Sequence, residues 1–295
     1  MRGLLLLVPA VGCGASLGTN SGGPGDDDQP DAPSVTPEGP TALGPWGAPQ
    51  KISIASDGVA NEDDGTLSYS GLELVFAVVN TADANRKDLF YTSRPDLQSS
   101  FGAATKLPFS INLSSEETPR FSADDLTLFF AMTDPGGVNG LDIYKVTRPD
   151  PGSTSWSAPI AVGGVSAAGT DKWFMPCGGN RYLMIVGADI AEGVLGAGAP
   201  AIVAELSSTS GETGTFLTQD CLTVYFASSR PDGLTNRIYR STRPDLATPW
   251  SVPTVVSDFA DLGGDQQDPF IATDDRTFVF VSNIGGSNDV YISTR

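Results

Sequence analysis

Residues Pro119–Val162 read PRFSADDLTLFFAMTDPGGVNGLDIYKVTRPDPGSTSWSAPIAV, and this stretch decides the fold. It contains three short apolar runs, LTLFFA, LDIYKV and SAPIAV, with Asp-Pro-Gly-Gly and Pro-Asp-Pro-Gly between them. Apolar, β-favouring runs separated by Gly, Pro and Asp are typical of consecutive antiparallel strands. We therefore expect this stretch to form one unit of short strands.

The same pattern returns along the chain. A second-strand segment occurs at Leu72–Val79, Leu126–Thr133, Tyr182–Ala188, Leu222–Ser229 and Thr277–Asn283. A third-strand segment occurs at Asp88–Asp96, Asp142–Asp150, Ala201–Ser208, Arg237–Asp245 and Asp289–Arg295. Copy three is degenerate, because it lacks the Asp and the Thr-Arg of the others. Leu72 and Leu126 are 54 residues apart, and a period of about 50 with several short strands per unit predicts a β-propeller.

A fourth-strand segment follows copies one, two and four, and it also precedes the first copy. It reads FGAATKL (Phe101–Leu107), WSAPIAV (Trp156–Val162), WSVPTVV (Trp250–Val256) and, at the start, WGAPQKI (Trp46–Ile52). The last copy stops at its third strand, so the N-terminal segment would complete it and leave no open edge. We expect an all-β, five-bladed propeller with four antiparallel strands per blade, closed by the N-terminal strand pairing into the last blade.

The repeat resembles that of the TolB-type, WD-like β-propellers. The residues that carry the resemblance in copy two are Pro119, Ser122, Asp124, Asp142, Ile143 and Tyr144. Where that family usually has Gly after the Asp, this chain has Asp125 and Asp275. The resemblance extends over almost all of residues 46–295 and implies the fold. It implies no function, because such propellers serve as scaffolds, binding modules and enzyme domains.

The N-terminus has the character of an export signal. Arg2 precedes a short apolar run, Leu4–Val11, and the sequence Ala10-Val11-Gly12-Cys13 resembles a bacterial lipobox. By that resemblance, residues 1–12 are a lipoprotein signal peptide and Cys13 carries lipid; the alternative is an ordinary signal peptide with a chance cysteine. Residues 13–45 are rich in Gly, Pro, Ser and Asp, without Lys or Arg, and predict a disordered acidic tether. Residues 46–295 are the propeller.

The composition narrows the partners and the chemistry. Seventeen Lys and Arg face thirty-five Asp and Glu, a formal net charge of −18, and there is no histidine. An acidic surface repels nucleic acid, so we expect no such partner, and membrane contact only through the lipid anchor. The absence of histidine excludes Ser-His-Asp and Cys-His catalysis and His-containing metal sites.

Polar residues that recur with the repeat are expected to be structural. They are the turn residues Asp124, Asp220 and Asp274, the strand-opening residues Asp88, Asp142 and Asp289, and the strand-ending residues Arg94, Arg148, Arg243 and Arg295. A short carboxylate at a turn accepts backbone N–H groups, and the arginines could pair with such carboxylates. A catalytic group is needed once, not once per blade, so we assign no catalytic residue.

A second acidic series is expected just before the innermost strands. It consists of Glu62, Glu116, Asp171, Glu212 and Asp265. Five carboxylates near one mouth of the central channel would form a negative rim able to hold a cation or a basic side chain; the alternative is that they are solvated loop residues. The acidic stretch ANEDDG (Ala60–Gly65) lacks the spacing of a calcium-binding EF-hand loop, and we expect neither a metal nor a cofactor.

Copy three holds the residues that depart from the repeat. Trp173 and Phe174 are candidates to line a ligand pocket, with core packing as the alternative. Cys177 lies at the end of the first strand of copy three, and Cys221 in a turn of copy four. Neighbouring blades could bring them into a disulfide, or they could be two buried thiols.

These observations favour a non-enzymatic, monomeric propeller, lipid-anchored to a bacterial outer membrane and facing the periplasm or the cell surface. It would bind or scaffold an unidentified protein or glycan of the cell envelope. The alternatives are a carboxylate-dependent glycoside hydrolase, which needs no histidine, and a lectin-like carbohydrate-binding propeller.

Overall fold

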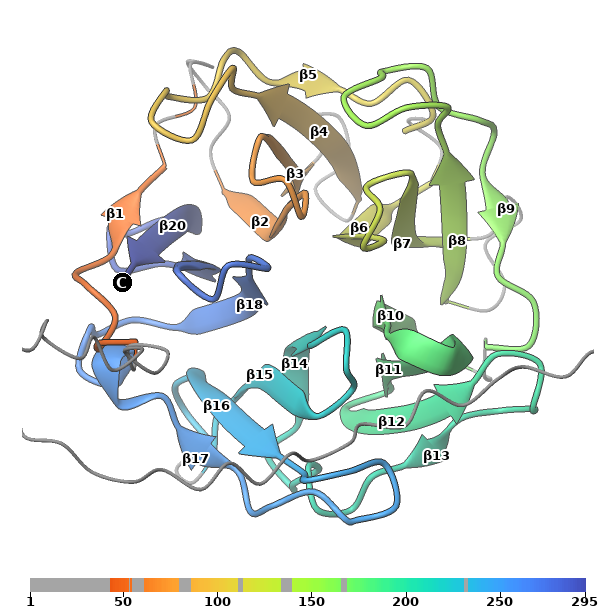
Figure 1. The fold of residues 1–295 in the computed structure, drawn as a ribbon, viewed down its shortest axis with the longest axis vertical. Coiled ribbons are helices and arrows are strands. Elements are labelled where there is room, and N and C mark those ends of the chain that lie inside the picture. The colour runs from red at the N-terminus through yellow and green to blue at the C-terminus, as the bar shows by residue number, and fades with distance from the viewer. Residues whose placement is uncertain are drawn as a thin grey trace, which may run out of the picture. The chain divides into compact units, whose positions relative to one another are not determined.

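The computed structural model describes residues 43–52, 54, 61–79, 86–110, 114–133, 140–165, 169–230 and 233–295. These residues form five four-stranded antiparallel sheets arranged around a central channel (Figure 1). The predicted five-bladed, all-β propeller is confirmed. The predicted signal peptide, Cys13 and nearly all of the predicted tether lie outside the described residues.

Each blade runs from an innermost strand to an outermost one. The innermost strands are β2 (Glu62–Leu67), β6 (Glu116–Phe121), β10 (Asp171–Pro176), β14 (Glu212–Leu217) and β18 (Gln266–Ile271). The second strands are β3 (Glu73–Val79), β7 (Thr127–Thr133), β11 (Arg181–Val186), β15 (Thr223–Ser228) and β19 (Thr277–Ser282). The third are β4 (Lys87–Ser93), β8 (Leu141–Thr147), β12 (Asp189–Val194), β16 (Arg237–Thr242) and β20 (Asp289–Thr294).

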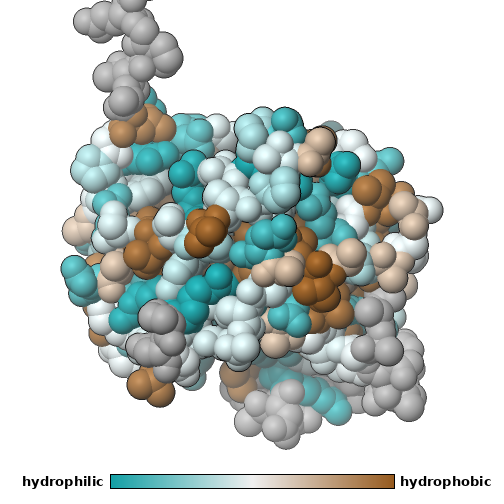
Figure 2. Space-filling model, turned by 90° about the horizontal axis from the view of Figure 1, so that it is seen from below, coloured by the Kyte–Doolittle hydropathy of each residue, from teal (hydrophilic) through white to brown (hydrophobic). Residues whose placement is uncertain are grey.

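The outermost strands are only two residues long. They are β1 (Gln50–Lys51), β5 (Thr105–Lys106), β9 (Ile160–Ala161), β13 (Ala201–Ile202) and β17 (Thr254–Val255). Short edge strands limit unwanted pairing between sheets of different molecules. On the flank drawn in Figure 2, apolar residues lie scattered among hydrophilic ones.

The ring closes as the sequence predicts. β1 pairs with β20 of the last blade, with Gln50 opposite Ile292 and Lys51 opposite Tyr291. Blades one to four are therefore β2–β5, β6–β9, β10–β13 and β14–β17, and blade five consists of β18–β20 with β1. This pairing removes the open edge that a linear array of blades would leave.

Copy three differs from its prediction. We expected its third strand at Ala201–Ser208, but the third strand is β12 and residues 201–202 form the outermost strand β13. The reason is a tight turn: Gly187 adopts a positive φ of 65° and, with Ala188, connects β11 directly to β12. In the other blades the connection between the second and third strands is longer, and the predicted position of the third strand in copy three was based on that longer spacing.

Neighbouring blades are joined by polar clamps and by one disulfide. The third-strand arginines serve as predicted structural residues: Arg148 binds Glu73 of blade one at 2.6 Å, and Arg243 binds Glu192 of blade three at 2.8 Å. Cys177 and Cys221 form a disulfide between blades three and four, with their Cα atoms 5.6 Å apart, which settles the choice that the sequence leaves open. No helix in the described part of the chain has the length and apolar character that a membrane crossing requires.

Candidate functional site

The third residue of every innermost strand has a positive φ. The values are 54° at Asp64, 53° at Thr118, 50° at Trp173, 54° at Gly214 and 52° at Asp268. In each strand the pairing register also breaks at this point, as in a β-bulge. Left-handed backbone is costly for residues other than glycine, so its recurrence in all five blades marks it as a property of the fold. A bulge re-aims a side chain, and three of these residues, Asp64, Trp173 and Asp268, contribute side chains to the channel.

Among the described residues, three hydrogen bonds join blades that are not neighbours and therefore cross the channel. The Trp173 indole Nε1 of blade three donates to Asp268 Oδ1 of blade five at 2.6 Å. Arg120 Nε of blade two donates to the Thr215 carbonyl of blade four at 3.4 Å. The Gln219 amide of blade four donates to the Tyr69 hydroxyl of blade one at 2.6 Å. Groups of the protein thus span the channel at these three places.

Gly214 makes room for the first of these crossings. It stands between Trp173 and Asp268 in the bulge series, in the blade that separates them. A Cβ atom at this position would lie 2.5 Å from the Asp268 backbone nitrogen and 2.8 Å from its carboxylate oxygen Oδ1. Only glycine fits, both because of this close approach and because of the positive φ.

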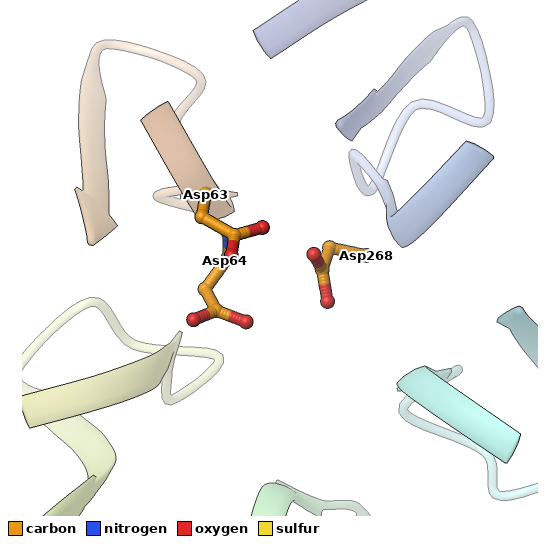
Figure 3. A group of neighbouring side chains, drawn as sticks. All are labelled: Asp63, Asp64 and Asp268. Carbon is orange, nitrogen blue, oxygen red and sulfur yellow. The ribbon is translucent and has the colours of Figure 1, made fainter. Parts of the chain in front are cut away.

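The carboxyl groups of Asp63, Asp64 and Asp268 form a cluster inside the channel (Figure 3), which we call the carboxylate cluster. One oxygen from each lies within 4.8 Å of the others, and Asp64 and Asp268 are buried. Lys87 Nζ contacts Asp63 at 2.6 Å and Asp64 at 3.1 Å. A metal ion at these three residues would have to displace the lysine, which already supplies the positive charge.

The three carboxyls titrate differently. Burial, together with the charges of Asp64 and Asp63, raises the pKa of Asp268 to about 8. Burial opposes ionisation of Asp64 as well, but the adjacent Lys87 and the more distant Lys172 lower its pKa. At neutral pH, Asp268 therefore holds a proton next to an ionised carboxylate, an arrangement that general acid chemistry uses.

The acidic residues expected at the channel mouth begin the innermost strands or directly precede one. Glu62, Glu116, Asp171 and Glu212 are the first residues of β2, β6, β10 and β14, and Asp265 precedes β18. The first four are buried. Among the described residues, none of the five belongs to a cluster of carboxylates as closely spaced as Asp63, Asp64 and Asp268. Their service as a cation-binding rim stays a prediction.

Protein groups already bind several of these carboxylates. Glu116 accepts hydrogen bonds from Ser110 and Ser114. Glu212 accepts from Ser208 and from Arg230 Nη2, the latter at 2.6 Å. These contacts hold the first residues of β6 and β14 against neighbouring segments.

A hollow of about 540 Å³ lies at this mouth, over blades three, four and five. Its wall includes Lys172 and Trp173 from β10, Ala188 from the β11–β12 turn, Glu212 and Thr213 from β14, and Asp265. We call it the mouth hollow. It brings together three of the residues singled out in the sequence, Trp173, Glu212 and Asp265.

Phe174, the other aromatic candidate, faces away from this hollow. It is buried between Phe129 of blade two and Tyr182, with ring centroids 5.0 and 4.9 Å away. Phe174 therefore packs the core, which was the alternative for this residue.

The carboxylate cluster is not predicted from the sequence. Asp63 and Asp64 lie in the acidic stretch Ala60–Gly65, which lacks the spacing of a calcium loop, and Asp268 belongs to none of the motifs described above. An alignment of the third residue of each innermost strand would have found Asp64, Trp173 and Asp268 together, since these positions share the bulge.

No family model matches the chain, and no curated protein matches it either. Among solved structures, the catalytic domain of a GH62 α-L-arabinofuranosidase from Coprinopsis cinerea is similar with a TM-score of 0.55 and 11% identity, over 85% of this chain and 96% of that one. A thermostable family-43 glycoside hydrolase gives 0.51 and 11%, over 82% and 91%. A putative TolB from Agrobacterium tumefaciens gives 0.48 and 16%, over 76% and 70%. At such identities the glycoside hydrolases share the propeller fold with this chain, and the likeness extends to nothing beyond the fold.

Proposed function

We propose that this chain is a non-enzymatic binding propeller of a bacterial cell envelope. The observation that carries the proposal is the set of contacts that spans the channel. Side chains from non-adjacent blades meet across it at Trp173–Asp268 and Tyr69–Gln219, and the Arg120 side chain reaches the Thr215 backbone carbonyl. A ligand would then be held at the mouth of the channel and not converted within it.

The state of the carboxylates supports this proposal. A glycosidase acid has to reach the glycosidic oxygen of its substrate. Asp268 is 1% exposed and its carboxyl is held by the Trp173 indole, while Lys87 holds Asp63 and Asp64. These groups are used by contacts within the protein, which suits a scaffold.

A product analysis tests the proposal. Purified protein is incubated with arabinan, xylan and peptidoglycan fragments, and the recovered material is examined for new reducing ends by mass spectrometry. We expect every fragment to be recovered intact. Release of new reducing ends by the protein, abolished by Asp268→Asn, would overturn the non-enzymatic proposal.

The second candidate is a glycoside hydrolase, and the carboxylate cluster favours it. The carboxylate oxygens of Asp63, Asp64 and Asp268 lie within 4.8 Å of one another. This distance is closer to the separation of about 5 Å between the catalytic carboxyls of a retaining glycosidase than to the separation of about 6.5–9.5 Å in an inverting one. Asp268 would be the acid, and Trp173 would have to move to admit a sugar. On this proposal hydrolysis falls as the pH rises through about 8, because the pKa of Asp268 lies there and the acid loses its proton.

The proposed location rests on the N-terminal sequence. The apolar run Leu4–Val11 followed by Cys13 supports export and lipidation. Metabolic labelling with palmitate should mark the chain in a bacterial host and fail to mark Cys13→Ala. Label that persists in this variant would exclude the anchor.

A further inference from the structure

The charged groups on the wall of the mouth hollow are already paired within the protein. Lys172 Nζ binds Glu117 at 2.6 Å. Glu212 binds Arg230 and Ser208. Asp265 accepts hydrogen bonds from the Asn236 backbone and from the Asn283 amide. Lys172 and Glu212 thus have partners of opposite charge, whereas Asp265 is held by neutral amide donors. An anionic ligand would meet no unpaired cation on the described part of this wall, and burying its own charge there would cost free energy.

The rest of the wall carries no charge. Besides Trp173, Ala188, Leu234 and three glycines, it includes Thr170, Ser210, Thr213, Ser229 and Asn236. The Thr213 hydroxyl has no accessible surface, so the polar side chains open to a ligand are those of Thr170, Ser210, Ser229 and Asn236. Hydroxyl and amide groups both donate and accept, so this wall matches a ligand that does the same.

We infer that the mouth hollow binds a neutral, hydroxyl-rich ligand, a short oligosaccharide segment of an envelope glycan. The inference rests on the proposed binding function and names its ligand class. The volume of about 540 Å³ lies within the roughly 300–1,000 Å³ of small-molecule sites. Trp173 also lines the hollow with the small part of its surface that is exposed; its indole nitrogen is fixed by Asp268, and Lys172 Nζ lies 5.5 Å from its ring centre.

Paired oligosaccharides and two matched variants test the inference. The full chain is applied to an array of neutral oligomers of N-acetylglucosamine, arabinose and xylose, with oligogalacturonate as the acidic counterpart. The affinity for the strongest neutral oligomer is then measured by calorimetry. Ala188→Trp fills the hollow from the exposed β11–β12 turn, whereas Ala197→Trp, also exposed, places the same side chain on the β12–β13 connection of the same blade.

We expect binding of a neutral oligomer and none of oligogalacturonate. Ala188→Trp should weaken this affinity about tenfold or more, and Ala197→Trp should leave it unchanged.

Three results would overturn the inference. They are equal binding by Ala188→Trp and the unmodified protein, a preference for oligogalacturonate, and no binding to any oligomer on the array. Equal binding by Ala188→Trp leaves the proposed binding function standing and moves the site elsewhere. Mass spectrometry of the bound oligomer separates the two proposals, since cleavage of the oligomer sinks the non-enzymatic function even where the hollow is its site.

Discussion

The interface between blades one and two and the interface between blades two and three join similar sheets by different chemistry. At the first, the Arg148 guanidinium binds the Glu73 carboxylate through both terminal nitrogens, and Asp125 accepts the backbone N–H groups of Tyr69 and Ser70. At the second, a separate apolar cluster spans the two blades, with Phe174 between Phe129 and Tyr182, and the ion pair there is the partly exposed Lys172–Glu117 contact.

The difference follows from the degenerate repeat. Blade three has no arginine at the end of its third strand, so it cannot repeat the clamp toward blade two. Aromatic packing replaces it, and the Tyr182 ring lies so close to Gly193 that a Cβ there would approach it to 2.4 Å. Toward blade four, the disulfide and the Arg243–Glu192 pair hold blade three in place. A blade that loses its polar signature thus stays in the ring through packing and a covalent bond, and it carries the Trp173 side of the mouth hollow.

The largest expected effect breaks the aromatic interface. Phe174→Ala removes a fully buried ring and leaves a cavity, so the free energy of unfolding should fall by about 4 kcal/mol. Urea unfolding measures it. Val252→Ala is the control, because Val252 is 82% exposed and should change stability by less than about 0.5 kcal/mol. Similar losses for both variants would contradict the role given to Phe174.

The next effect breaks the polar clamp. Arg148→Met leaves the buried Glu73 carboxylate without its cation, and unfolding should become easier by about 3 kcal/mol. Arg94→Met is the matched control, since Arg94 ends the third strand of blade one and stacks over Phe101 but is partly exposed; its loss should be about 1 kcal/mol. Adding Glu73→Gln to Arg148→Met should recover part of the stability. Equal, small losses of unfolding free energy in the two arginine variants would show that the Arg148–Glu73 pair does not stabilise the fold.

The covalent link should matter less. Cys177 and Cys221 are separated by 44 positions in the sequence, and the Arg243–Glu192 ion pair also joins the two blades. We expect the double variant Cys177→Ser with Cys221→Ser to lose about 2 kcal/mol, measured by urea unfolding without reductant. A reductant should lower the stability of the unmodified protein and leave the double variant unchanged; a double variant that still responds would contradict this assignment.

The smallest effect concerns the seam between blades five and one. Burial, and then the charge of Asp289, raise the pKa of Glu62 to about 7 in the folded protein. Because its pKa is lower when unfolded, the folded state binds more protons between about pH 4.5 and 7, and this group makes stability fall as pH rises through that window. In Glu62→Gln the decrease in unfolding free energy between about pH 4.5 and 7 should be smaller by about 1 kcal/mol. The comparison is the unfolding free energy of both proteins at several pH values; parallel curves would contradict the prediction.

Much of the fold could be predicted from the sequence. The five copies, their strands and the closure by Trp46–Ile52 follow from apolar runs and from turn residues. The third strand of copy three could not be placed, because a two-residue turn changes the spacing without leaving a strong signal. Of the candidate site, Trp173, Glu212 and Asp265 were found individually, whereas the group of Asp63, Asp64 and Asp268 was not.

The sequence by itself determined the number of blades, the ring closure and the structural role of the repeated Asp and Arg residues. Those features depend on local periodicity and on turn chemistry that recurs in each copy. Only the tertiary structure decided which side chains meet across the channel, that Cys177 bonds to Cys221, and where the mouth hollow lies. The physical reason is that these contacts join residues far apart in the chain, from non-adjacent blades or from turns of neighbouring blades, so local periodicity does not specify them.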